Sequence, residues 1–263
     1  MQRIVTLTTD FGLSDGFVGM MKGVILNLNP NVTIIDITHE ITPQNIEQGA
    51  FLFANAHKYF PANSIHVVIV DPGVGGSRRP IAARDGETLF VAPDNGILST
   101  VLRPSSSVIC LNKSAYWLPR VSHTFHGRDI FAPIAAHLSL GVPLEALGDP
   151  IADWVRLAHC NASWRAGNEI VGRVAHIDRF GNIVTNIGEE MLTGMNRARI
   201  GVTIRDKVLT GVKSTYSTVV PGELLMLIGS SGHLEIAIRN GNAAQSLGVR
   251  LGDDVIARGG DSG

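Results

Sequence analysis

The strongest constraint on the fold of this chain is the alternation of apolar and amphipathic segments over its first 70 residues. The apolar segments are 3–9, 32–37 and 64–70, and the amphipathic segments are 14–30 and 45–60. Continuously apolar segments rich in β-branched residues are typical of strands buried on both faces. Apolar side chains at helical spacing predict helices between them, and Pro30 and Pro61 end these helices. The pattern predicts an α/β unit with a mostly parallel central sheet and helices on both faces.

The first predicted helix carries its apolar residues on one face. These residues are Phe17, Met20, Met21, Val24, Ile25 and Leu28. Beyond residue 79 we expect strands at 80–84, 88–92 and 106–111 and helices at 94–102 and 129–141. The Asp85-Gly86 pair, a tight-turn sequence, separates the first two of these strands and predicts a hairpin.

The sequence pattern changes between residues 150 and 167, after which only short strands and turns are indicated. The expected strands are 169–177, 182–187, 198–209, 223–229, 233–239 and 253–258. Strands at this spacing, separated by Gly and Asn, favour a small antiparallel sandwich or barrel. The sequence therefore predicts two domains, an α/β domain over 1–160 and an all-β barrel domain over 168–263, joined by the segment HCNASWRAGN.

Composition excludes several functional classes. The 263 residues carry a formal net charge of −1, and no basic excess favours a nucleic acid or an anionic membrane as a partner. Cys110 and Cys160 are too few for a disulfide framework and fit a reducing compartment. The N-terminal segment lacks the pattern of a signal peptide, and no apolar run is long enough to span a membrane. We expect a soluble, cytoplasmic protein.

Polar groups follow the predicted parallel strands where those strands end. They are Asp10, Asp36, Thr38, His39, Glu40, Asp71, Asp94 and Asn95. In an open α/β sheet, ligands bind beyond the carboxyl ends of the strands, so these groups are candidates for one site. A single aspartate at such a position is also a common helix cap or turn residue. The sequence leaves both interpretations open.

The segment VDPGVGGSRR, residues 70–79, is the most informative of these strand ends. Asp71 begins a glycine-rich loop that lacks the GxxxxGK[ST] phosphate-binding pattern. Arg78 lies seven residues later and can pair with Asp71 if the loop folds back. The alternative is that Arg78 and Arg79 are solvated loop charges.

Three further segments carry groups suited to binding or catalysis. In the loop before the helix predicted at 129–141, His126 is a possible proton acceptor close to His123. In the segment 176–187, Asp178, Phe180, Asn182 and Asn186 combine an aromatic ring with polar groups, a combination that suits a flat heterocycle but also a surface hairpin. The segment 229–248 can present Gly, Ser and Asn backbone groups to a ligand or simply form a turn.

A metal site is an alternative use of some of these residues. Its candidate ligands are Asp10, His39, Asp71, Asp94, His123 and His126. The chain has no HxxxH, HxH or CxxC spacing, so the sequence does not favour a metal.

Seven segments, in their order along the chain, resemble one family. They are TLTTDFG, DITHEI, VVIVDPGVG, FVAPDNG, TFHGRDIFAP, IDRFGNIVTNI and LEIAIRNGNAA. Together they are similar to the adenosine-forming S-adenosyl-L-methionine (SAM) hydrolases, also called SAM hydroxide adenosyltransferases, which are related to SAM-dependent fluorinases and chlorinases. The resemblance runs from residue 4 to about residue 257. It implies an α/β domain followed by a β-barrel, and a homotrimer with its sites between subunits.

The resemblance also implies a reaction and the residues that perform it. SAM and water give adenosine and L-methionine without a cofactor, since SAM is the substrate. The catalytic set of the family corresponds to Asp71, Arg78 and His126, which would hold and orient the attacking water. The substrate-binding positions correspond to Asp10, Asp178, Phe180, Asn182, Asn186, Ser231, Asn242 and Ala243.

Four positions favour water over halide as the nucleophile. The related halogenases carry tryptophan where Gln44 stands and lack the counterparts of Asp71 and His126, and the fluorinase carries serine where Gly127 stands. We keep three alternatives: a SAM halogenase, a non-catalytic SAM or adenosine sensor, and a metal-dependent hydrolase. Halide-dependent products, binding without turnover, and sensitivity to chelators distinguish them.

Overall fold

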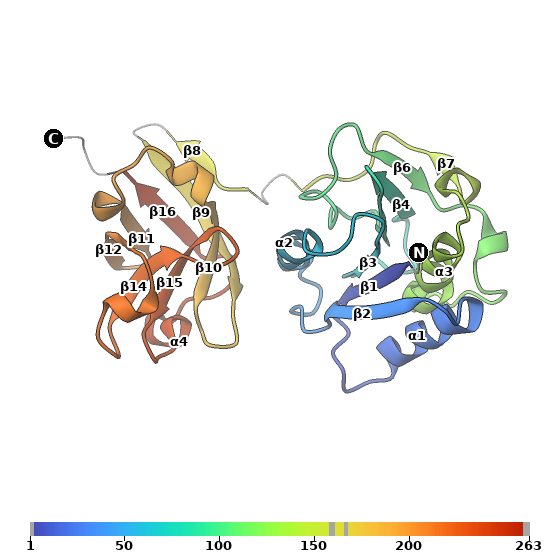
Figure 1. Cartoon of the computed structure of the whole chain (residues 1–263), viewed down its shortest axis with the longest axis horizontal. Coiled ribbons are helices and arrows are strands. Elements are labelled where there is room, and N and C mark those ends of the chain that lie inside the picture. The colour runs from blue at the N-terminus through green and yellow to red at the C-terminus, as the bar shows by residue number, and fades with distance from the viewer. Residues whose placement is uncertain (1–2, 158–160, 166–167, 260–263) are drawn as a thin grey trace. The chain divides into compact units, whose positions relative to one another are not determined.

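The computed structural model describes residues 3–157, 161–165 and 168–259, so Cys160 and part of the predicted linker lie outside the described residues. The chain divides into two compact units, Met1–Leu157 and Ala158–Gly263. Figure 1 shows the elements of each unit, and each unit is described by itself below. Among the described residues, no helix has both the length and the apolar character needed to cross a membrane.

The N-terminal unit is built on a seven-stranded sheet with the order β2-β1-β3-β5-β4-β6-β7. The strands are β1 (Ile4–Thr9), β2 (Thr33–Thr38), β3 (Ile65–Ile69), β4 (Pro80–Asp85), β5 (Thr88–Pro93), β6 (Ser107–Cys110) and β7 (Asp149–Pro150). The pairings among β2, β1, β3 and β5 are parallel, whereas β4, β6 and β7 pair antiparallel. The predicted β4–β5 hairpin is confirmed. The sheet is mixed, because β6 and β7 extend it antiparallel beyond this hairpin, and the description of the sheet as mostly parallel is not confirmed.

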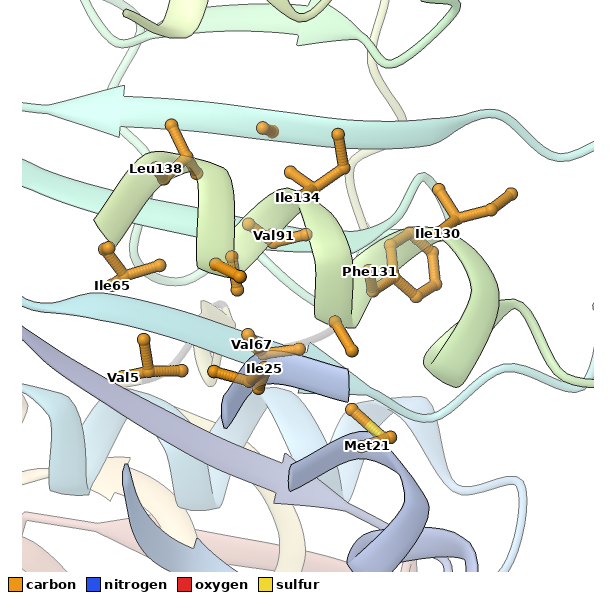
Figure 2. Close-up of a cluster of buried hydrophobic side chains, with 14 of the residues drawn as sticks. Val5, Met21, Ile25, Ile65, Val67, Val91, Ile130, Phe131, Ile134 and Leu138 are labelled. Carbon is orange, nitrogen blue, oxygen red and sulfur yellow. The ribbon is translucent and has the colours of Figure 1, made fainter. Parts of the chain in front are cut away.

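Buried side chains of β3 alternate between the two faces of this sheet. Its odd-numbered residues, such as Val67, join a core with α1 (Phe17–Leu28) and α3 (Ala132–Ser139). Figure 2 shows part of this core, with Ile134 and Leu138 of α3 near Val67 and Val91. The even-numbered Val68 joins a second core with Phe53 of α2 (Ile46–His57). Helices thus cover both faces, and the carboxyl ends of the parallel strands remain open to loops.

A five-residue π-helical turn, Gly127–Phe131, precedes α3 and begins directly after His126. The helix predicted at 129–141 is therefore shorter and begins irregularly. The helix predicted at 94–102 was wrong, because these residues form turns. Gly96 adopts φ +93°, and a Cβ there would lie 2.6 Å from Leu157. The segment is shaped by packing against a residue 61 positions away, which local periodicity does not report.

The C-terminal unit is a nine-stranded, nearly barrel-shaped sheet. Its path is β12-β11-β16-β9-β10-β15-β14-β13, with β8 paired to β9. The strands are β8 (Ser163–Arg165), β9 (Glu169–Ile177), β10 (Ile183–Gly188), β11 (Gly201–Ile204), β12 (Lys207–Thr210), β13 (Val212–Lys213), β14 (Leu224–Ile228), β15 (His233–Ile238) and β16 (Asp254–Arg258). The single strand predicted at 198–209 is instead the β11–β12 hairpin, which turns at Arg205 with φ +51°. A short helix, α4 (Ala243–Leu247), follows β15.

His66 of β3 is a buried histidine with almost no exposed surface. Its ring stacks on Phe90 with centroids 5.6 Å apart, and Nδ1 lies 2.7 Å from the Thr6 hydroxyl. Burial, reinforced by the nearby charge of His57, lowers the pKa of His66 to about 3. The ring is therefore neutral in the folded protein throughout the physiological pH range.

This depressed pKa makes stability sensitive to acid. The unfolded chain takes up a proton on this ring near pH 6.5, whereas the folded protein does so only near pH 3. Between these values the unfolded state binds more protons, so this contribution to stability is complete above pH 6.5 and is lost as the pH falls toward 3. The limiting slope is about 1.4 kcal/mol per pH unit. Denaturant unfolding at pH 7.5 and 5.0 should show wild type losing about 1–2 kcal/mol more than His66→Gln; equal losses would contradict this assignment.

Candidate active site

The loop after β3 folds back on itself and pairs Asp71 with Arg78. The Arg78 Nε lies 3.0 Å from Asp71 Oδ1, and Nη2 lies 2.5 Å from Oδ2. Both side chains are largely buried, with exposed fractions of 6% for Asp71 and 10% for Arg78. Of the two interpretations of Arg78, the solvated one is therefore wrong. A buried, two-point ion pair of this kind fixes the carboxylate in position.

His126 extends this pair into a three-residue network. The Arg78 Nη2 also lies 2.8 Å from His126 Nδ1. Because a guanidinium can only donate, Nδ1 accepts and the proton of the neutral ring is on Nε2. Burial, followed by the positive charge of Arg78, lowers the pKa of His126 below its ordinary value. The site therefore presents a carboxylate and a neutral imidazole that both contact one guanidinium.

Gly75 allows the two loops of this network to meet. It adopts φ +75°, and a Cβ at this position would lie 2.2 Å from the carbonyl oxygen of His123. Every other residue type would therefore clash with the backbone of the 122–126 segment and strain its own. This close approach brings a loop from β3 against the loop that carries His126.

Replacing Gly75 by alanine should separate these loops. We expect Gly75→Ala to lower the activity of the site about 100-fold, the size of effect that an ångström-scale misplacement can have. Gly86→Ala is the matched control, because Gly86 also has a positive φ of +60° in a loop of this unit, but a Cβ added there would meet no atom within 4 Å. Steady-state rates and thermal melts of both variants decide the outcome. Equal rates for the two variants would show that the loop contact does not matter.

A cavity of about 190 Å³ opens beside the network. Its lining residues are Phe11, Phe17, Ile69, Asp71, Val74, Thr124, Phe125, His126 and Gly127. Two of the three network residues thus face a space bounded mainly by apolar side chains. Apolar walls lower the local dielectric and so strengthen the interactions of the polar groups beside them.

Asp10 leaves the end of β1 and is held by a strained residue. The Gln44 backbone N–H donates to Asp10 Oδ2 at 2.7 Å, and Gln44 adopts φ +67°. A left-handed conformation at a residue other than Gly costs about 1 kcal/mol or more and is concentrated at functional sites. The carboxylate retains further acceptor capacity, because an ionised carboxylate has about four lone-pair positions.

The other strand-end groups have structural partners. Asp36 pairs with Lys22 at 2.6 Å and lies 3.1 Å from His39 Nε2. Asp94 accepts from Arg79 Nε and from the Val155 backbone N–H, both at 2.8 Å. These bonds hold the segment around Val155, near the end of the N-terminal unit, against the residues that follow β5. Over residues 3–157, 161–165 and 168–259, no three His, Cys, Asp or Glu side chains are grouped to hold a metal ion.

In the C-terminal unit, Asp178 organises the turn between β9 and β10. Its Oδ1 accepts from the backbone N–H groups of Phe180 and Asn182, both at 2.9 Å, and Oδ2 accepts from Asn182 Nδ2. Phe180 is 75% exposed on this turn. The segment therefore forms the hairpin turn that was the alternative interpretation. This turn carries the Phe180 ring exposed to solvent.

The same turn contacts the start of α4. The Asn242 side chain lies over Gly181 and accepts from the Gln245 N–H at 2.7 Å, and the Ala244 N–H donates to Gly181 O at 3.0 Å. The structure thus brings Asp178, Phe180, Asn182, Asn242 and the adjoining Ala243 together. The other two predicted residues have contacts elsewhere: Asn186 Oδ1 accepts from the Arg173 N–H, and Ser231 lies beside His233.

Comparison with known proteins identifies the family. A model of the SAM hydroxide adenosyltransferase N-terminal domain matches residues 5–148, and a model of the C-terminal domain of that family matches residues 172–256. The chain belongs to the SAM hydroxide adenosyltransferase family. The resemblance predicted from the sequence is thereby confirmed.

Relatives of this family member match nearly its whole length. It is 38% identical over 255 residues to the (R)-S-adenosyl-L-methionine hydrolase of Salinispora tropica, covering 95% of each chain. A crystal structure of an uncharacterized conserved protein from Thermotoga maritima superposes with a TM-score of 0.89 at 37% identity, covering 97% of this chain and 99% of that one. A fluorinase of an Actinoplanes species is more distant, at 28% identity over 286 residues and 95% coverage of each chain.

Sequence reasoning missed two features of this chain. One is the aromatic wall of the cavity, in which Phe17 is 41% exposed. The other is Glu235, a buried carboxylate of β15 that accepts from the Tyr216 hydroxyl at 2.5 Å. Burial raises the pKa of Glu235, and the nearby charge of Asp178 adds to this effect. The lone carboxylate in the apolar segment HLEIAI was the available signal.

Proposed function

We propose that this protein hydrolyses SAM to adenosine and L-methionine, with Asp71, Arg78 and His126 holding the attacking water. The observation that carries the proposal is the contact network of these three residues at one cavity, in a chain whose relatives are named SAM hydrolases. An Asp–Arg–His network needs neither a metal nor another cofactor to position water, and the proposal includes none.

The chemistry is a displacement at the ribose C5′. The water oxygen forms a bond to C5′ while the C5′–S bond breaks, and its electron pair remains on sulfur as the neutral thioether of methionine. This leaving group needs no general acid, so catalysis must act on water, which is a weak nucleophile. The neutral His126 ring has one basic lone pair, on Nδ1, and it already accepts from Arg78. The Asp71 carboxylate also accepts from Arg78 but keeps further acceptor positions, so it is the base that takes the proton of water. Positioning the water in line supplies much of the remaining rate acceleration.

The rest of the substrate binds through Asp10 at a strand end and, in the proposed trimer, through the C-terminal unit of a neighbouring subunit. Asp10 accepts from the ribose hydroxyls with the acceptor positions that Gln44 leaves unused. Phe180 stacks on the adenine, and Asp178 and Asn182 line the nucleoside site, with Asn186 nearby. The segments containing Ser231, Asn242 and Ala243 hold the methionine end and the adenine edge.

We also propose a cytoplasmic homotrimer in which each site lies between subunits, with no nucleic acid or membrane as a partner. The cavity beside Asp71, at about 190 Å³, is smaller than the 300–1,000 Å³ typical of small-molecule sites. A site completed by a second surface fits this shortfall. Sedimentation of the purified protein distinguishes a trimer from a monomer.

The deciding experiment is product analysis. The purified protein is incubated with SAM of each configuration at sulfur, since the relatives' names specify the (R) form. Parallel reactions contain EDTA, chloride or fluoride, and chromatography separates the products. Adenosine and methionine in equal amounts, unaffected by these additions, support the hydrolase. A halogenated nucleoside would indicate a halogenase, loss of activity with EDTA a metal enzyme, and bound but intact SAM a sensor.

A further inference from the structure

Three phenylalanines that contact one another line the cavity. Phe11 follows β1, Phe17 begins α1, and Phe125 precedes His126. Their ring centroids lie 5.2–6.0 Å apart, and all three pairs meet edge to face. A Cβ on Gly127 would lie 3.2 Å from Phe125 and 3.4 Å from Phe11, so the backbone beside His126 packs directly against this wall.

The aromatic rings near the site differ in whether a cationic side chain of the protein already lies over them. The Arg128 guanidinium lies 5.0 Å from the centroid of Phe125, and the Arg78 guanidinium lies 5.4 Å from that of Phe131. Within the described part of the chain, no Lys or Arg lies over Phe11 or Phe17. Phe17 is also 41% exposed although it lines the cavity. An aromatic ring left exposed beside a polar network, without a cation of its own, can receive the cation of a ligand.

The in-line geometry of the displacement determines where the sulfonium cation of SAM must lie. The attacking oxygen, C5′ and the sulfonium sulfur lie on one line, with the reacting atoms about 3–3.5 Å apart before reaction. The sulfur therefore lies on the side of C5′ that faces away from Asp71 and His126. Phe17 lines the same cavity of about 190 Å³ as Asp71 and His126, so its ring is available to the part of the substrate that lies beyond C5′.

We propose that Phe17, supported by Phe11, forms the subsite for the sulfonium group of SAM. The negative face of an aromatic ring attracts a cation, and a sulfonium with three carbon substituents is as weakly hydrated as the ligands that aromatic sites favour. The attraction ends when the C5′–S bond breaks and the sulfur becomes neutral. The subsite thus favours substrate over methionine, and this inference rests on the proposed function.

The test separates the attraction of the aromatic face for a cation from the space that the side chain fills. Phe17→Leu keeps an apolar side chain and removes the aromatic face, whereas Phe17→Tyr keeps the face. We expect Phe17→Leu to raise KM for SAM about 3- to 30-fold without lowering kcat, because the lost attraction is stronger in the ground state than in the transition state. The inhibition constant of S-adenosyl-L-homocysteine, the uncharged thioether, should change less than 2-fold, and Phe17→Tyr should restore KM.

Met20→Leu is the matched control, since Met20 is also 41% exposed on α1 but does not line the cavity. An unchanged KM in Phe17→Leu would overturn the subsite. An equal rise in the inhibition constant of S-adenosyl-L-homocysteine would also overturn it, because shape rather than charge would then be recognised. A wild-type protein that forms no adenosine overturns the proposed function and this inference together, whereas an active wild type with either of the first two results overturns the inference alone.

Discussion

The Asp71→Asn variant is expected to turn over SAM about 100- to 10,000-fold more slowly than wild type, with a much smaller change in KM. An amide cannot take the proton of the attacking water, and the loss of a general base has an effect of this size. Asparagine keeps the volume of the side chain and one oxygen that can accept from Arg78. The comparison is made from initial rates of adenosine formation at saturating substrate.

Asp85→Asn is the control for this variant, because Asp85 also pairs with an arginine of the N-terminal unit, Arg103 at 2.9 Å. Arg103 is well exposed, so this pair should contribute little to stability and nothing to turnover. Thermal melts are needed for both variants, because removing one partner of a buried ion pair such as Asp71–Arg78 destabilises a protein by about 3–5 kcal/mol. A folded Asp71→Asn protein with the rate of wild type would exclude Asp71 as the base.

The second large effect is expected at Arg78, whose guanidinium contacts both other members of the network. Arg78→Lys keeps the charge but cannot reproduce the two-point contact with Asp71 or reach His126 in the same geometry. We expect kcat to fall about 100-fold in this variant and further in Arg78→Met. Arg79→Lys serves as the control, because Arg79 pairs with Asp94 and Asp153, away from the cavity.

The pH profile of Arg78→Met gives a readout that simple misfolding would not produce. The charge of Arg78 lowers the pKa of His126, whereas Asp71 raises it. Burial, the larger cause of the lowered pKa, remains when Arg78 is removed, so the pKa of His126 should rise toward its ordinary value. Because the neutral ring is the form in the network, the acid limb of the kcat profile should move to higher pH in Arg78→Met and remain in place in Arg78→Lys. An unmoved limb in Arg78→Met would separate His126 from the pH dependence.

Local signals and strand-end geometry together offered one contact that the structure shows, that between Asp71 and Arg78. Asp71 was a candidate because a buried strand ends abruptly there at a glycine-rich loop. Of the two interpretations of Arg78, the structure shows the ion pair with Asp71. The sequence could not choose between them, because the choice depends on Gly75 meeting the carbonyl of His123, 48 residues away. A contact of this kind leaves no periodic pattern.

The aromatic wall shows a different limit. Helical periodicity placed Phe17 on the same face as Met21 and Ile25, and that face does point to the sheet. The structure buries Met21 and Ile25 completely but leaves Phe17 and Met20 at the edge of the face, each 41% exposed. A period of 3.6 residues gives the direction of a face and not its width, so a ring that borders a cavity is counted as part of the core. The exposure of the Phe17 side chain depends on the neighbouring loops, which the helical period does not describe.

The π-helical turn at Gly127–Phe131 has a consequence for how this site tolerates insertions and deletions. Each residue of an α-helix turns the chain by about 100°, so removing one residue from this turn to make it regular would rotate everything before it by that angle. His126 would then point away from Arg78 while α3 kept its buried face. The irregular turn therefore lets His126 point to Arg78 while α3 keeps its buried face. A single-residue deletion in this turn should abolish activity in a protein that still folds. The same deletion within α3 would disturb its buried core.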